Sequence, residues 1–451
     1  MVIEKERASL PTVVVDGGNL FWKSQVLPQA DRAQRLIKAE LQAEAYQLAG
    51  IDAMVPGPGD LALGVETWGG LVDKYSLPIV AANLQCDGRE IPGYRVVERE
   101  GRKIGIVGVV DDGVQGCTVT DPVAAAVSAV KALGPVDLLL VLSSADTSSD
   151  DKLVAKIPEV DFIVSGGAGG LMTPEPKALE GGAYRLGSGS RGKKLGVLEL
   201  TWVDGANGWS SSGKGDESQE RLDQFLSRLE DANKDLEAAK DDAGRERVQK
   251  RINYYNVEIT RLKAQIDEQK AASGGPANSF DHRLVDLDTE VGEHAATQAL
   301  VDKAKLAITA AGTTPQPSAP VTNGPLGGSQ ACRGCHLTEY AQWDTTPHAH
   351  AYNALEASQR HLDDECFSCH VTGASLPGGP QRAAEVSATL RNVGCESCHG
   401  PANEHARNPQ LVKMSAAVDT ATCTTCHDGV RDEGRFDAAT YLPKVAHQPA
   451  K

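Results

Sequence analysis

The sequence predicts a layered α/β domain with an inserted antiparallel helical hairpin, followed by a small domain that is mostly helical or irregular. Three observations predict this. Residues 1–205 alternate short β-branched runs with helical stretches, residues 218–270 repeat apolar side chains at steps of three and four, and eight of the ten cysteines follow residue 330. Because 451 residues are more than one hydrophobic core usually absorbs, several domains are expected.

Within residues 1–205, short apolar runs predict buried strands, and the stretch Ala33–Leu48 predicts a helix. Several runs end in Gly or Asp, where α/β sheets bind ligands, although such sequences also form simple tight turns. The predicted strands are Val13–Val15, Ala53–Val55, Pro78–Val80, Ile104–Val107, Leu138–Val141 and Phe162–Val164, with a closing strand at Lys194–Val203.

Residues 218–270 predict two helices that meet along an apolar seam. Apolar side chains recur from Leu222 to Ala239 and from Val248 to Ile266, with a polar turn at Asp241–Gly244 between them. The charged outer faces predict solvated helix surface, with docking or oligomerisation as the alternative. Residues 271–310 should return the chain to the α/β domain, and the Pro- and Gly-rich residues 311–328 should link it to a domain at 329–451.

One motif, Cys-x-x-Cys-His, contains all eight of the late cysteines. Two thiols at this spacing can each add to one vinyl group of a haem, and the adjacent His then binds the iron. Zinc sites and disulfides are the competing interpretations, but neither requires a His after every second Cys. The motif therefore predicts four covalent c-type haems, attached at Cys332 and Cys335, Cys366 and Cys369, Cys395 and Cys398, and Cys423 and Cys426, with His336, His370, His399 and His427 as proximal iron ligands.

The remaining cysteines, Cys86 and Cys117, are expected to be buried apolar thiols. The haem motifs occupy only 96 residues, 332–427, so the porphyrins must pack on one another and form most of that domain's core. The low aromatic content of 4% fits a domain whose large apolar groups are cofactors.

Residues 331–427 resemble the tetrahaem cytochrome c family that carries electrons in ammonia oxidisers, and related multihaem reductases. The similarity rests on the first motif with Tyr340, Trp343 and Thr346-Pro347-His348, on Glu365–Gly373, and on Asn392–Pro401 with His405. The resemblance implies that His348 and His405 are distal iron ligands. The further distal candidates are His350, His361 and His447, so up to four irons could have two His ligands, or one haem could keep an open sixth position.

The first 200 residues resemble the metallophosphoesterase domain of the periplasmic 5′-nucleotidase family, in the strand order from Val13–Asn19 to Val160–Gly166. That family binds two metals through Asp and His side chains. Here its first motif is absent, and no His occurs before residue 282. Asn19, Gly57–Asp60, Ser144 and Gly166–Gly169 stand where the family has ligands or catalytic groups. Asp16 and Asp60 alone cannot form a dinuclear site, so the resemblance implies the fold and predicts a pseudoenzyme used as scaffold or docking module.

With 61 acidic and 45 basic residues the chain has a formal charge of −16, which disfavours nucleic acid as a partner and favours a basic or haem-bearing redox partner. No apolar run approaches the roughly 18 residues of a membrane span. Covalent haem attachment predicts a periplasmic or cell-surface protein. The start Met-Val-Ile-Glu lacks a signal peptide, which indicates a processed form or a misplaced start.

The sequence thus predicts an exported multihaem c-type cytochrome that carries electrons between redox partner proteins or to an external acceptor. A redox enzyme acting on a small nitrogen or sulfur compound at an open haem is the first alternative. A metal-dependent phosphohydrolase is the second.

Overall fold

A computed structural model describes residues 1–22, 32–111, 116–166, 176–189, 192–211, 217–238, 242–272, 278–313, 324–374, 376–429, 432 and 435–447. The chain divides into two compact units, each considered by itself below. The first unit comprises residues 1–26 and 42–295, and the second comprises residues 27–41 and 296–451. No helix in the described ranges has the length and apolar character needed to cross a membrane.

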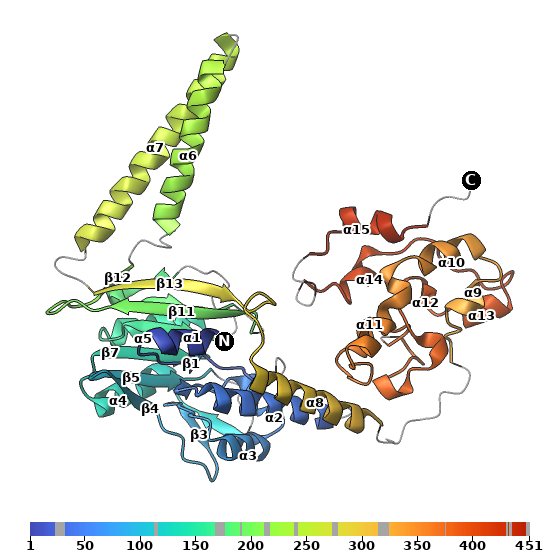
Figure 1. The fold of residues 1–451 in the computed structure, drawn as a ribbon, viewed down its shortest axis with the longest axis horizontal. Coiled ribbons are helices and arrows are strands. Elements are labelled where there is room, and N and C mark those ends of the chain that lie inside the picture. The colour runs from blue at the N-terminus through green and yellow to red at the C-terminus, as the bar shows by residue number, and fades with distance from the viewer. Residues whose placement is uncertain are drawn as a thin grey trace. The chain divides into compact units, whose positions relative to one another are not determined.

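The largest sheet of the first unit has six strands in the order β4-β5-β7-β8-β10-β9 (Figure 1). Its four inner strands are parallel, and the outermost strand on each side is antiparallel to its neighbour. All six residues of β7 are buried, as expected for a parallel strand covered on both faces. The strands are β4 (Tyr94–Arg99), β5 (Arg102–Val109), β7 (Leu138–Ser143), β8 (Phe162–Ser165), β9 (Lys177–Ala178) and β10 (Tyr184–Leu186).

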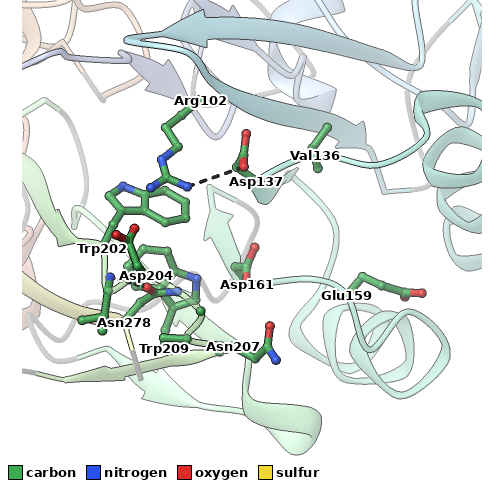
Figure 2. A pocket seen from close by; sticks show the side chains of 14 residues that line it. Arg102, Val136, Asp137, Glu159, Asp161, Trp202, Asp204, Asn207, Trp209 and Asn278 are labelled. Carbon is green, nitrogen blue, oxygen red and sulfur yellow. Dashed lines mark hydrogen bonds and ion pairs between the residues drawn. The ribbon is translucent and has the colours of Figure 1, made fainter. Parts of the chain in front are cut away.

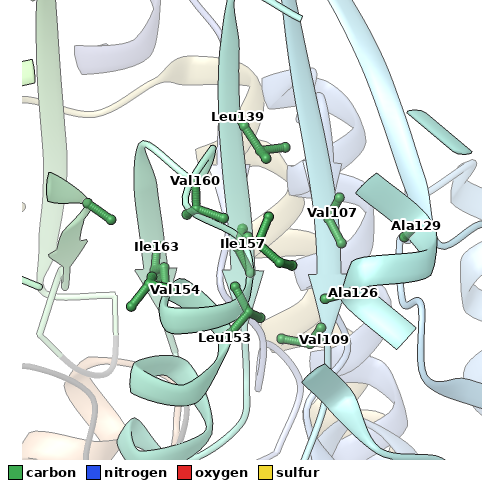
Figure 3. Packing of buried hydrophobic residues seen from close by; sticks show 12 residues of the cluster. Val107, Val109, Ala126, Ala129, Leu139, Leu153, Val154, Ile157, Val160 and Ile163 are labelled. Atoms are coloured by element: carbon green, nitrogen blue, oxygen red, sulfur yellow. The ribbon is translucent and has the colours of Figure 1, made fainter. Parts of the chain in front are cut away.

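Two amphipathic helices, α4 (Pro122–Leu133) and α5 (Thr147–Lys156), pack against this sheet (Figure 3). An aspartate caps each N-terminus: Asp121 accepts a hydrogen bond from the Ala124 N–H, and Asp146 accepts one from the Ser149 N–H. The shared core consists of Val107, Val109, Ala126, Ala129, Leu139, Val141, Leu153, Val154, Ile157, Val160, Ile163 and Ala183.

Three smaller sheets complete the first unit. They pair β1 (Val15–Asp16) with β2 (Ala53–Met54), β3 (Leu84–Cys86) with β6 (Cys117–Val119), and β13 (Asn278–Asp286) with both β11 (Lys194–Thr201) and β12 (Trp209–Ser211). Besides α4 and α5, this unit contains α1 (Val2–Ser9), α3 (Val65–Tyr75), the C-terminal part of α2 (Arg32–Ala49) and the two helices described below.

The predicted strands at 13–15 and 78–80 differ most from what the sequence indicated. The first predicted strand is limited to Val15–Asp16, because the N–H of Val14 donates to the Asp52 side chain instead of to a strand. The stretch 78–80 forms only an isolated bridge between Met54 and Ile79, and Pro78 has no N–H for a ladder.

The prediction that Cys86 and Cys117 are buried thiols is wrong, because the two residues form a disulfide. Strands β3 and β6 are antiparallel and place Cys86 directly opposite Cys117, with their Cα atoms 4.3 Å apart. Neither strand is long or apolar enough to reveal this pairing in the sequence.

Helices α6 (Glu217–Ala238) and α7 (Asp242–Ala272) lie side by side (Figure 1). Leu222, Ile259 and Leu262 are buried between them, with Phe225 and Leu229 packed against this cluster. Residue 241, in the predicted polar turn, lies outside the described residues.

The second unit contains α8 (Ala295–Thr313), the start of α2 and a series of short helices. The sequence placed residues 271–310 with the α/β domain; of this stretch, β13 belongs to the first unit and α8 groups with the second. One reason is that Gln34 of α2 donates to the carbonyls of both Ile308 and Leu362. The short helices are α9 (Ser329–Cys332), α10 (Leu337–Asp344), α11 (Ala351–Ala357), α12 (Cys395–His399), α13 (Asn403–Arg407), α14 (Thr420–Thr424) and α15 (Ala438–Val445).

The second unit has a small protein core. Among the described residues from 324 onward, few apolar side chains are buried: Ala349, Tyr352, Leu355, Phe367, Val371, Pro380 and Ala383. So few side chains cannot stabilise more than 100 residues against the entropy lost on folding. An additional apolar component must complete this core.

Candidate functional site

The eight motif cysteines all lie in the second unit as thiols, with no disulfide among them. The thiols of Cys332 and Cys395 hydrogen-bond each other, which brings the first and third motifs together and lowers the pKa of the Cys395 thiol. Cys398 lies within electrostatic range of Cys423, so the third motif also adjoins the fourth. In the described part of the chain, no group of three or more His, Cys, Asp or Glu side chains could hold a metal ion.

The second cysteines of the first and fourth motifs, Cys335 and Cys426, are not part of these contacts between motifs. Cys335 is exposed, and the Sγ of Cys426 accepts a hydrogen bond from the Thr425 hydroxyl at 3.8 Å. In each of these two motifs, the carbonyl of the first cysteine accepts from the N–H groups of both the second cysteine and the histidine, at 3.2 and 2.9 Å. One turn therefore carries all three motif side chains in each of these motifs, and attachment of haem to each of the eight motif cysteines, Cys335 and Cys426 included, stays a prediction.

Three of the four motif histidines face a second imidazole ring. The ring centroids are 6.4 Å apart for His336 and His405, 6.3 Å for His427 and His348, and 6.1 Å for His399 and His447. Each pair therefore combines one histidine of a motif with one that lies outside all four motifs.

This spacing is compatible with two imidazoles on opposite sides of one metal ion. An imidazole nitrogen binds a metal at about 2.0 Å and the ring centroid lies roughly 1.1 Å further out, which gives about 6.2 Å between the centroids. The planes of the paired rings differ by 14° to 48°. Such angles are compatible with a shared ion, because each ring can rotate about its bond to the metal.

Hydrogen bonds to the Nδ1 atoms orient several of these rings. Nδ1 lies 2.6 Å from the Ala351 carbonyl in His370, 3.2 Å from that of Ser415 in His399, and 2.7 Å from that of Val412 in His405. A neutral imidazole that donates from Nδ1 keeps the lone pair of Nε2 for a metal. These hydrogen bonds leave Nε2 of His370, His399 and His405 available to a metal.

His370 of the second motif differs from the other three motif histidines, because none of the described imidazoles stacks opposite it. His350 is exposed, and its Nε2 lies 3.0 Å from the Asp344 carbonyl. The ring centroids of His361 and Tyr352 are 6.4 Å apart, and the buried Nδ1 of His361 has no hydrogen-bond partner. The sequence left both as distal candidates, and neither lies in one of the three pairs.

Two apolar side chains near the pair of His336 and His405 are exposed to solvent. Leu337, which follows His336, is 63% exposed, and Leu411, which precedes the carbonyl partner of His405, is 85% exposed. A flat apolar cofactor between the two rings would give such side chains a surface to cover. Together with the small core, the paired rings and the adjacent thiols, this exposure fits covalently held haem.

Glu396, between the two cysteines of the third motif, is a structural residue that the sequence analysis did not single out. Its side chain is 1% exposed and accepts hydrogen bonds from the backbone N–H groups of Gly327, Gly328 and Ala402. A buried carboxylate with three donors joins the start of this domain to the third motif. The sequence carries no signal for this role, because an acidic residue at that position is as compatible with solvent exposure.

The polar residues at the strand ends of the first unit have hydrogen-bond partners within the protein. Asp60 lies in the 3₁₀ helix η2 (Pro58–Leu61) and accepts hydrogen bonds from the N–H groups of Asn19, Phe21 and Gly57. Asp16 accepts from the Tyr46 hydroxyl at 2.7 Å, and Ser144 donates to the Pro56 carbonyl. Burial raises the pKa of both carboxyls, that of Asp60 to about 7. Residues 167–169 of the last family motif lie outside the described residues.

The first unit also contains a pocket of about 310 Å³ that includes none of the predicted site residues (Figure 2). Asp137, Asp161, Trp202 and Trp209 contribute to its lining. The Arg102 guanidinium lies over the Trp202 ring at 4.5 Å and forms an ion pair with Asp137 at 3.7 Å, so the charge and the aromatic face are already paired within the protein.

Thiols in repeated Cys-x-x-Cys-His motifs, oriented imidazole pairs and a small protein core define a multihaem c-type cytochrome region that binds haem covalently. Comparisons with known proteins agree. Residues 331–400 match the family described as cytochrome c554 and c-prime, and residues 389–432 match a doubled CXXCH motif. The region resembles cytochrome c-554 of Nitrosomonas europaea, with 32% identity over 110 residues, which cover 20% of this chain and 46% of that protein. The chain thus spans less than half of this relative.

Several solved structures similar to the first part of the chain bear the names of hydrolases. They include the sulfate thiohydrolase SoxB of Thermus thermophilus, with 20% identity and a TM-score of 0.38 over 44% of this chain and 38% of that one. A 5′-nucleotidase precursor from the same organism has 20% identity and a TM-score of 0.38 over 45% of this chain and 44% of its own.

Proposed function

We propose that this chain is an exported electron carrier with four covalent c-type haems, three of them held between two imidazoles. The proposed pairs are His336 with His405, His399 with His447, and His427 with His348. The observation that carries the proposal is the centroid separation of 6.1 to 6.4 Å in all three pairs, each of which joins a motif histidine to one elsewhere.

When bound, haem supplies reversible one-electron chemistry at its iron. The protein's task is to hold the ligands still. The backbone carbonyls at Ala351, Ser415 and Val412 fix the orientation of the His370, His399 and His405 rings, so each ring would need little reorganisation when the charge of a bound iron changes. Saturated ligation on both sides favours electron transfer over substrate binding.

The contact between Cys332 and Cys395 supports close packing of the attachment sites. Four attachment sites within 96 residues leave little protein between neighbouring cofactors. Electrons can then pass along the set without a moving part.

Replacing His405 with Met tests the ligand assignment. Methionine in place of one imidazole raises the potential of a haem iron, so one of the four midpoints should rise while the covalent haem count stays at four. His350→Met is the matched control, because His350 is exposed and lies outside the three pairs. A shift with His350→Met and none with His405→Met, in a spectroelectrochemical titration, would reverse the assignment.

A second candidate function is catalysis at the second motif, because His370 has no imidazole opposite it among the described residues. An open sixth position there could bind a small nitrogen or sulfur compound. Addition of carbon monoxide or nitrite should then change the optical spectrum of one haem. A spectrum that is indifferent to both ligands would leave only the carrier function.

We further propose that the α/β unit is a scaffold or docking module without hydrolase activity. Asp16 and Asp60 are engaged by Tyr46 and by backbone N–H groups, and Asn19 and Ser144 replace ligand positions of the resembling family. Turnover of a nucleotide with added divalent metal, abolished by Asp16→Ala, would contradict this proposal.

The proposed location is the periplasm or cell surface, where covalent haem attachment takes place. The proposed partners are redox proteins or an external acceptor. Net acidity of −16 should favour a positively charged partner, with association that weakens as salt increases.

A further inference from the structure

A cluster of charged side chains joins helix α2 to the loop that precedes the second motif. Lys38 of α2 lies 2.6 Å from Asp363 and 2.7 Å from Glu365, measured from its Nζ to the carboxylate oxygens. Arg35, one turn earlier on α2, forms an ion pair with Glu365 at 3.1 Å. All these residues belong to the second unit, although Lys38 and its two partners are 325 and 327 positions apart in sequence.

Hydrogen bonds connect the residues of the cluster, and several of its side chains are buried or partly buried. Asp363 is 1% exposed and Lys38 is 20% exposed. Asp363 also accepts from the N–H of Glu365, while Gln34 of α2 accepts from the N–H of Asp364. A carboxylate this deeply buried needs a close cation, so Lys38 is its main compensation.

The same charges act on an attachment cysteine. Glu365 directly precedes Cys366, whose N–H donates to the Asp363 carbonyl. Burial raises the pKa of the Cys366 thiol to about 11; the Asp363 charge and its hydrogen bond to the thiol add to this effect, and the charges of Arg360 and Lys38 oppose it. Lys38 and Asp363 are therefore near the atom that holds the second haem.

We infer that the charges of Lys38 and its carboxylate partners set the reduction potential of the haem attached to Cys366 and Cys369. The inference requires haem at the second motif but not the carrier function of the whole protein. Helix α2 would thereby add to one haem a positive charge from outside the motif-bearing segment, beside that of Arg360 within it. The neighbouring haems would keep potentials set by their own surroundings.

The expected signs follow from electrostatics. A nearby positive charge stabilises the reduced iron and raises its potential, and a negative charge lowers it. At partly buried sites a single charge can change the ratio of oxidised to reduced haem about tenfold, which for a one-electron couple corresponds to about 59 mV. Removing Lys38 and removing a carboxylate should therefore shift the same haem in opposite directions.

The experiment compares Lys38→Met, Glu365→Gln and Lys38→Arg in the full-length holoprotein by spectroelectrochemical titration, after mass spectrometry has shown that haem loading is unchanged. Lys38→Met should lower the midpoint potential of one haem by the shift that corresponds to an about tenfold change in its ratio of oxidised to reduced form. Glu365→Gln should raise the same midpoint potential, and Lys38→Arg should leave it unchanged. Lys305→Met is the control, because it removes the same charge from an ion pair with Asp302 within helix α8.

A purely structural role would not produce opposite signs. If Lys38→Met and Glu365→Gln moved the midpoint in the same direction, or if neither moved any midpoint, the inference would be wrong. Glu365 is 43% exposed, so its substitution tests the inference even if Lys38→Met fails to fold. Loss of haem from the second motif in the unmodified protein would instead refute the haem assignment on which the inference depends.

Discussion

The disulfide between Cys86 and Cys117 should contribute strongly to the stability of the α/β unit, and replacing both residues with Ala tests this. The bond joins β3 to β6 across a sequence separation of 31 residues. These strands pair with each other in a two-stranded sheet, and such an isolated pair has little stability of its own. The disulfide is therefore expected to keep the intervening chain closed.

The length of the closed loop gives the size of the effect. In the chain-entropy description, closing a loop of 31 residues removes about 12 cal/mol/K from the unfolded ensemble, or about 3.7 kcal/mol at 25 °C. For a domain of this size each kcal/mol changes the midpoint of thermal unfolding by roughly 2–4 °C, so a decrease of roughly 7 to 15 °C is expected.

Thermal unfolding of the double variant should be followed by far-ultraviolet circular dichroism for the α/β unit and by haem absorbance for the second unit. The first signal should melt earlier, while the second should stay where it is, because no motif cysteine takes part in the bond. An unchanged first transition would refute the loop-closure reasoning. A shift of the haem transition alone would mean that the bond stabilises a different part of the molecule.

Three further predictions concern the rest of the chain. Glu396→Ala leaves three buried N–H groups without an acceptor and should destabilise the haem unit by about 3 kcal/mol in a denaturant titration, whereas Glu396→Gln, which keeps one acceptor oxygen, should cost less. Burial raises the pKa of Asp60 to about 7 and that of Asp161 to about 6, so the folded α/β unit binds protons more tightly than the unfolded chain between about pH 4 and 7. Its free energy of unfolding should therefore be highest near pH 4 and fall as the pH rises to about 7; urea titrations showing an increase would contradict this. Replacing residues 218–270 with a short Gly linker should leave both the circular dichroism of the sheet and the haem spectrum intact, because α6 and α7 bury their apolar residues against each other; insoluble protein would argue otherwise.

The elements that the sequence predicted well are those with a strong local signal. The buried run at β7 and the helical period of α2 depend on short-range patterns, and both occur close to the expected positions. The Cys-x-x-Cys-His motif is equally local, because haem chemistry fixes the spacing of all its members. Family resemblance added His348 and His405, which a single sequence does not otherwise distinguish from surface histidines.

Contacts between segments that are distant in the chain could not be predicted from the sequence. The pairing of Cys86 with Cys117 depends on the register of two three-residue strands. His447 lies 20 residues beyond the last motif, and only the fold brings its ring within 6.1 Å of the His399 ring, measured between centroids. Likewise, no local pattern places Lys38 next to Asp363, because a basic residue on a helix is most often solvated.

The central claim is that four haems are covalently attached and that three of their irons are bound by two imidazoles. The most direct test combines the intact mass of the purified protein with electron paramagnetic resonance of the oxidised form. The mass should exceed that of the polypeptide by four haems, and the spectrum should contain three low-spin signals typical of paired imidazole ligation. A mass increment of two haems or of zinc, or a spectrum in which most irons are high-spin, would contradict the claim.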